Sequence, residues 1–182
     1  MSLPGTWSKT GIKVCLLLSL LSAGCDSFKP VDSCDFADSE IKGYTKTNTQ
    51  GQVTDEDSDD WRESPTYGLY VRVDPIFPNP VRSSNSTLRI TLYDVLGGQL
   101  SNIDVIARKR DGQWVSLIPT LGRPKSIPDV GIWLLPVDLT RLSDNGTLSE
   151  ISGLHRIYVV DSPLATDLCT SIISYGEVFI LP

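Results

Sequence analysis

The sequence has few of the residues that most enzymes use for catalysis. It contains one histidine in 182 residues, which excludes the two-histidine zinc motif H-E-x-x-H. The motifs G-x-S-x-G and G-x-G-x-x-G and the phosphate-binding P-loop are also absent, and these mark hydrolases and nucleotide-binding proteins. The single histidine, His155, falls inside an expected strand with no nucleophile at a recognisable spacing. We therefore predict a protein that is not an enzyme and has no catalytic residue and no cofactor.

Clusters that bind metals or nucleic acids are equally scarce. The four cysteines form no C-x-x-C pair, so zinc and thioredoxin-like redox sites lack support. The acidic run Asp55–Asp60 lacks the central glycine and the final glutamate of an EF-hand calcium loop. The basic run Arg108–Arg110 has three residues, whereas nucleic-acid binding requires a basic patch. We predict no metal site and no nucleic-acid partner.

Negative charge is concentrated in one segment of the chain. Residues 25–65 hold eleven acids and four bases, a balance of −7, whereas residues 66–182 hold eleven acids and ten bases, a balance of −1. Large apolar side chains are few in the first of these segments, and low hydrophobicity with excess charge disfavours a packed core. We predict a flexible acidic linker over residues 26–65 and one folded domain over residues 66–182.

The amino-terminal segment has the pattern of an export signal. Lys9 and Lys13 precede the apolar run Val14–Leu21, and the small residues Ser22–Gly24 follow it. A helix that spans a bilayer needs about 20 apolar residues, so this run is too short for a permanent membrane segment. A basic start, a short apolar stretch and a small-residue cleavage zone predict a signal peptide over residues 1–24.

The segment Leu21–Cys25 resembles the lipobox of bacterial lipoproteins, although Ser22 stands where that family usually has a branched apolar residue. The resemblance implies cleavage before Cys25 and lipidation of its thiol, including palmitate-like acyl chains. One acyl chain holds a protein to a membrane only marginally, so several are needed for a stable anchor. The implied location is the cell envelope, on the inner or outer membrane, with the domain in the periplasm or at the cell surface.

Two cysteines remain once the signal peptide and Cys25 are set aside. Cys34 and Cys169 form an even pair in an exported chain, and oxidising compartments permit disulfides. We predict a Cys34–Cys169 bond, with two free thiols as the alternative. In the chain-entropy description, closing so long a loop contributes roughly 4–5 kcal/mol.

From Tyr67 onward the hydrophobic pattern alternates with a period of two, which is typical of half-buried strands. Asp111-Gly112 is a strong hairpin signal, and one helical turn is expected near Val137–Leu142. The fold class we predict is all-β: a single antiparallel β-sandwich, Ig-like or fibronectin-III-like, with about seven strands. The expected strands cover residues 69–73, 88–93, 103–108, 114–117, 131–135, 154–160 and 174–181.

The run Phe77-Pro78-Asn79-Pro80-Val81 and the strand order after it resemble the β-sandwich sorting modules at the carboxyl ends of type IX-secreted proteins. In that family the module is an address attached to a larger cargo. The resemblance implies the sandwich fold and, as an alternative function, a secreted protein with a sorting-like domain. The two prolines themselves indicate a structural turn, because proline lacks a backbone donor.

The function we expect is that of a membrane-anchored, non-catalytic module that binds or scaffolds another envelope protein. A carbohydrate-binding lipoprotein is one alternative. It requires coplanar, exposed aromatic rings, and the candidates are Trp114, Trp133, Tyr158 and Tyr175. A small hydrolase is another, and it requires a pocket that holds His155 with a carboxylate such as Asp94, Asp104 or Glu177. A small-molecule ligand is not indicated by any motif.

Overall fold

The structure is a computed structural model that describes residues 40–93, 100, 102–118, 130–161 and 168–182. The chain divides into two compact units, Met1–Asp32 and Ser33–Pro182, and all described residues belong to the second. The expected signal peptide, Cys25 and Cys34 lie outside the described residues, so the predictions made for them remain predictions.

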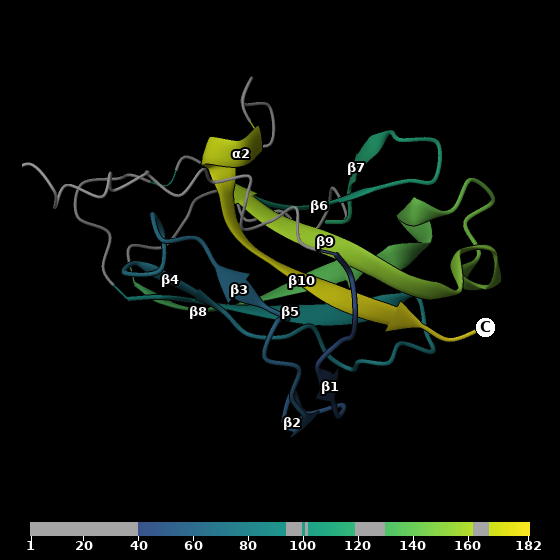
Figure 1. Ribbon diagram of the computed structural model, residues 1–182, viewed down its shortest axis with the longest axis horizontal. Coiled ribbons are helices and arrows are strands. Elements are labelled where there is room, and N and C mark those ends of the chain that lie inside the picture. Colours follow the sequence, from purple (N-terminus) through teal and green to yellow (C-terminus); the bar gives the residue numbers. More distant parts are fainter. Residues whose placement is uncertain (1–39, 94–99, 101, 119–129, 162–167) are drawn as a thin grey trace, which may run out of the picture. The chain divides into compact units, whose positions relative to one another are not determined.

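The described residues form a mostly β structure, as predicted (Figure 1). Each of the seven expected strands is present, and three short strands precede residue 66. The expected helical turn is the 3-10 helix η2 (Leu139–Leu142), followed by η3 (Leu148–Ile151) and the short helix α2 (Leu168–Ser171). The strands are β1 (Lys46–Thr47), β2 (Val53–Asp55), β3 (Arg62–Glu63), β4 (Val71–Val73), β5 (Asn85–Leu92), β6 (Ile103–Arg108), β7 (Trp114–Ser116), β8 (Gly131–Asp138), β9 (Gly153–Asp161) and β10 (Ile172–Ile180).

The ten strands of the described residues form three sheets. The sequence predicts about seven strands in a single sandwich. The larger sheet has the order β3-β10-β9-β6-β7, the smaller has the order β4-β5-β8, and β1 pairs with β2 alone. Neighbouring strands in all three sheets are antiparallel. Strands β9 and β10 share the longest ladder of the larger sheet, from Ile172↔Val160 to Ile180↔Gly153.

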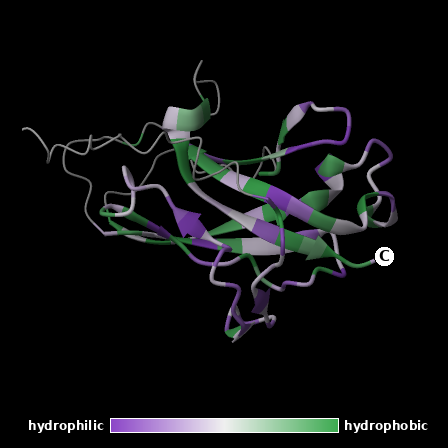
Figure 2. Cartoon of the chain, viewed as in Figure 1, coloured by the Kyte–Doolittle hydropathy of each residue, from purple (hydrophilic) through white to green (hydrophobic). Residues whose placement is uncertain are grey.

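The two larger sheets share one apolar core. Alternate residues of β5 and β8 are buried, as the period of two requires. Figure 2 shows apolar residues along the strands of both sheets and polar residues in the turn between β6 and β7. The inward side chains of the two sheets belong to one cluster, which includes Val71, Leu88, Ile90, Leu135, Val105, Ile157, Val159, Val178 and Ile180.

The segment Phe77–Val81 ties the amino-terminal part of the fold to β10. Both prolines follow cis peptide bonds, and Asn79 between them is fully buried. The Asn79 amide Nδ2 donates to the carbonyl oxygens of Thr45 (2.9 Å) and Glu177 (3.0 Å), and its Oδ1 accepts from the Phe179 N–H (3.0 Å). The Asn79 side chain therefore connects its own turn to the segment around Thr45 and to β10. The sequence predicts the turn but not these connections.

The expectation of a flexible linker is wrong for residues 40–65. Asp60 and Trp61 are buried, and β3 extends the larger sheet by pairing with β10. β3 is the edge strand of the larger sheet, and Figure 1 shows the β1–β2 pair outside both larger sheets. The physical reason is that the polar side chains of this segment bond to backbone groups of the fold, so they satisfy donors and acceptors that would otherwise be buried without partners.

The Trp61 indole ring packs directly against the backbone of Gly176. A Cβ at Gly176 would overlap the Trp61 indole ring, and Trp61 has φ 55°, a left-handed conformation that is costly for a bulky residue. The contact with the bare backbone of β10 holds Trp61 in this conformation. The absence of a side chain at position 176 therefore leaves the space that the Trp61 ring occupies.

We predict that Gly176→Ala lowers the free energy of unfolding by about 1–3 kcal/mol, the usual cost of overpacking. In a Trp61→Ala background the added methyl meets no ring, so the same substitution has little further effect. Urea unfolding of the four proteins measures this coupling. Equal costs of Gly176→Ala in both backgrounds would contradict the proposed fit.

Candidate functional site

The carboxylate of Asp60 is the centre of a buried polar cluster between the amino-terminal segment and β10. Its Oδ1 accepts the backbone N–H groups of Glu177 (2.6 Å) and Trp61 (2.9 Å), and its Oδ2 accepts that of Thr45 (2.6 Å). Charge-assisted bonds of this kind are about twice as strong as neutral ones. One side chain thus fixes three backbone segments to one another.

Glu177 and Arg156 complete this cluster on neighbouring strands. The Arg156 guanidinium bonds to Glu177 Oε1 through Nε (2.6 Å) and Nη2 (2.5 Å), and both side chains are almost fully buried. Arg156 also lies over the ring of Tyr175, 4.6 Å from its centroid. Burial, followed by a hydrogen bond with the Asp60 carboxyl, raises the pKa of Glu177 to about 8. The two facing carboxyl groups therefore favour retention of a proton between them, and the Arg156 guanidinium offsets their remaining negative charge.

A cavity of about 450 Å³ lies beside this cluster, between the 40–65 segment and β4. Burial raises the pKa of Glu63, one of its lining acids, and Arg72 pairs with Asp74 at 3.1 Å. The predominantly negative lining disfavours phosphate-bearing ligands such as nucleotides. The charged residues that line it are Glu56, Asp57, Asp60, Glu63, Arg72 and Asp74. Within the described ranges, no three histidine, cysteine, aspartate or glutamate side chains gather as a metal site would require.

The second surface of interest is an exposed apolar row on the smaller sheet. Val130 is 59% exposed, Ile132 66% and Leu134 60%, and Pro136 is exposed on the same side. Strand β8 carries these last three residues and is an edge strand, since β5 is its one neighbour in the sheet. We call Val130, Ile132, Leu134 and Pro136 with the backbone of β8 the β8 edge.

The four aromatic residues considered for carbohydrate binding do not form a coplanar exposed platform. Trp114 meets Tyr158 edge-on at 73°, and Tyr158 and Tyr175 are inclined at 43°. Tyr175 is fully buried, and Trp133 packs in the core from the other sheet. Tyr175 and Tyr158 pack with Ile106, Val160 and Ile172 in a second apolar cluster, whereas Trp114 is exposed.

His155 is held by a backbone contact. Its Nε2–H donates to the Ile151 carbonyl oxygen at 2.6 Å, and burial lowers its pKa, so the neutral form is favoured. His155 is not among the residues that line the cavity. Of the carboxylates considered with it, Asp94 lies outside the described residues, while Asp104 bonds to the Ser116 hydroxyl at 2.6 Å.

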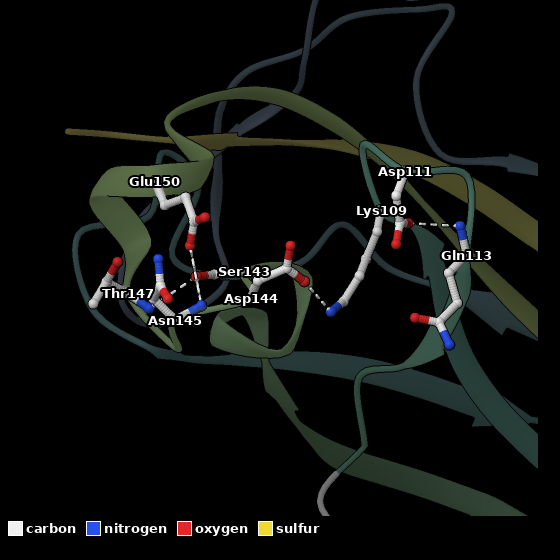
Figure 3. Close-up of polar contacts among 8 residues, drawn as sticks. All are labelled: Lys109, Asp111, Gln113, Ser143, Asp144, Asn145, Thr147 and Glu150. Carbon is white, nitrogen blue, oxygen red and sulfur yellow. Dashed lines mark hydrogen bonds and ion pairs between the residues drawn. The ribbon is translucent and has the colours of Figure 1, made fainter.

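The loop between η2 and η3 is organised by Ser143 (Figure 3). The Ser143 hydroxyl donates to Glu150 and accepts the backbone N–H groups of Asn145 (3.1 Å) and Thr147 (3.1 Å). Hydrogen bonds from the Ser143 hydroxyl and the Asn145 N–H lower the pKa of Glu150. Asp144 reaches across to Lys109 at 2.7 Å, which ties this loop to the turn between β6 and β7. The side chains of Ser143, Glu150, Asp144 and Lys109 therefore have structural partners.

Of the cysteines, Cys169 alone is described, and it is disulfide-bonded. It lies in α2, immediately before β10. Cys15, Cys25 and Cys34 all lie outside the described residues, so the pairing of Cys34 with Cys169 and the lipidation of Cys25 stay predictions.

Sequence reasoning missed Asp60, Arg156 and the β8 edge. Asp60 belongs to an acidic run that was interpreted as a solvated spacer, and Glu177 was considered as one of several scattered carboxylates. No spacing in the sequence links residues 60, 156 and 177, because antiparallel pairing across long separations brings them together.

Comparisons of the chain with protein-family models, curated proteins and solved structures found no match. None of the helices in the described ranges is both long and apolar enough to cross a bilayer.

We predict that the Asp60–Glu177 pair makes stability depend on pH. Glu177 has a folded pKa of about 8 against an ordinary value of 4.5. Its protonated form therefore stabilises the fold fully below about pH 4.5, and this contribution is lost as the pH rises towards 8. Glu177→Gln retains the donor and the acceptor but does not titrate, so the free energy of unfolding should vary less between pH 5 and 8.

Urea unfolding across this pH range measures the difference. Glu150→Gln is the matched control: the folded pKa of Glu150 is lowered, so its contribution changes in more acidic solution. Parallel curves for the native protein and Glu177→Gln would contradict the raised pKa of Glu177.

Proposed function

We propose that this chain is a membrane-anchored envelope lipoprotein whose β domain is a non-catalytic, protein-binding module. The domain is an Ig-like sandwich formed by the five-stranded and three-stranded sheets. Their shared core supports this proposal, since side chains of both sheets meet in one cluster. The anchor is a lipid on Cys25, and the supporting evidence is the lipobox-like segment Leu21–Cys25.

The observation that carries the binding function is the β8 edge. Proteins usually protect an exposed strand edge with charges or by covering it, because its backbone groups can pair with another chain. Here three of the most exposed apolar side chains of the described part lie together on and beside one edge strand. Such a surface is typical of an interaction site.

The folded state of residues 40–65 supports a short anchor. Between Cys25 and the first described residue are Asp26–Ser39, 14 residues, and even fully extended these would span roughly 50 Å. The β8 edge is therefore confined to a layer near the membrane, where it can meet other envelope proteins. The predicted Cys34–Cys169 bond would shorten this distance further.

We predict that Cys25→Ser moves the protein from the membrane fraction to the soluble fraction, because no acyl chains can then be attached. Cys25→Ala should do the same, whereas Ser22→Ala should leave the protein in the membrane. Fractionation and mass spectrometry of the mature amino terminus provide the readout. Retention of the Cys25→Ser protein in the membrane would overturn the lipid anchor.

A photoreactive amino acid at position 134 should give a defined protein adduct in intact cells. The same residue at Gln113, which is exposed on the turn between β6 and β7, serves as the control and should give none. Mass spectrometry identifies the adduct. If positions 134 and 113 gave the same products, or neither gave any, the β8 edge would not be a binding surface.

A further inference from the structure

The β8 edge differs from the other sheet edges of the described residues. The larger sheet ends at β3, whose two residues are Arg62 and Glu63, and at the three-residue strand β7. The smaller sheet ends at β4, which carries Arg72. Strand β8 has eight residues and no charge before Asp138. It therefore has none of the charged side chains that normally prevent strand addition.

We propose that this edge pairs with the β8 edge of a second copy of the chain. The two strands run antiparallel and are related by a two-fold axis, with Trp133 of one copy opposite Trp133 of the other. This inference rests on the proposed function and names the occupant of its binding surface. The two smaller sheets then form one continuous sheet of six strands. A two-fold axis requires a surface that is complementary to itself, and the next two observations show that β8 meets this condition.

Pro136 limits the register of the pairing. Proline has no N–H to donate to a neighbouring strand, so it suits a position whose backbone groups point away from that strand. The neighbour of Pro136 is β5, so the backbone of position 136 faces outward. Backbone groups of alternate residues point the same way, so those of Ile132 and Leu134 also face outward. A ladder centred on Trp133 then covers Gly131–Leu135, within β8 and short of Pro136. A centre at Leu134 would place Ile132 opposite Pro136 and lose a hydrogen bond.

The side chains are complementary in this register. Ile132 of each copy lies opposite Leu134 of the other, so each of the two most exposed apolar residues of β8 meets an apolar partner. The nearest charges on the same face, Arg72 and Arg89, both pair with Asp74, at 3.1 and 3.5 Å. Asp138 ends β8 and lies beyond the five-residue ladder, so its charge does not oppose the second copy.

The size of this contact indicates a weak dimer in free solution. A five-residue ladder with two apolar pairs falls below the roughly 1,200 Å² that stable interfaces bury. Anchoring of both copies through Cys25 confines them to one thin layer and raises their effective concentration. The dimer should therefore form at the membrane and dissociate when the protein is released from it.

The test uses disulfide trapping in membranes that contain the full-length protein. Residues opposite each other in an antiparallel ladder have Cα atoms about 5.5 Å apart, within the range that a disulfide can bridge. Co-expression of Ile132→Cys with Leu134→Cys should give a mixed disulfide dimer at several times the yield of either variant alone. Leu69→Cys, which is exposed outside β8, should give no such dimer with Leu134→Cys.

The outcomes separate this inference from the proposed function. A mixed dimer that depends on the 132–134 pair supports the inference. If Leu134→Cys alone dimerised as well as the mixture, the register centred on Trp133 would be overturned. If no dimer formed while the photoreactive residue at position 134 captured a different protein, the second copy would be excluded and the binding function would stand. Loss of both signals would overturn both proposals.

Discussion

The hydrogen bonds to the Asp60 carboxylate determine how the amino-terminal part of the domain is arranged. Two oxygens accept three backbone N–H groups, from Thr45, Trp61 and Glu177. Without them, the buried backbone of the 40–65 segment would lose its partners at β10, and an unsatisfied buried group costs about 1–3 kcal/mol. The Trp61 ring then packs on Gly176, and β3 joins the larger sheet. The domain thus begins well before Tyr67, where the alternating hydrophobic pattern of the sequence starts.

This arrangement has a consequence for the proposed anchor. A charged, flexible spacer would hold the β domain far from lipid and let it turn freely. In the proposed lipoprotein, a folded 40–65 segment would shorten the chain between Cys25 and the sheets and hold the domain closer to the bilayer. The β8 edge can then act on neighbours in the same membrane, where weak contacts are sufficient. The proposed lipid anchor, the folded 40–65 segment and the uncharged β8 edge are consistent with one another. Together they describe a module that associates with other proteins at a membrane.

Much of the fold could be predicted from local patterns, because half-buried strands alternate with a period of two. Strand β5 and the turn at Gly112 follow such rules, and Gly112 has the expected positive φ. The docked segment could not be predicted, since Asp60 resembles its solvated neighbours until a distant strand supplies its donors. The run Gly131–Leu135 likewise identifies a strand, but continuous apolar character is typical of strands buried on both faces. Ile132 and Leu134 are exposed because they lie on the face of the smaller sheet opposite the core.

Amide hydrogen exchange at individual residues tests the central claim most directly, because it reports whether the 40–65 segment is folded onto β10. The account predicts that the N–H groups of Thr45, Trp61 and Glu177 exchange slowly, with protection close to that of the β9–β10 ladder. Rapid exchange at Thr45 and Trp61, at the rate of an unfolded chain, with Glu177 unprotected, would contradict it.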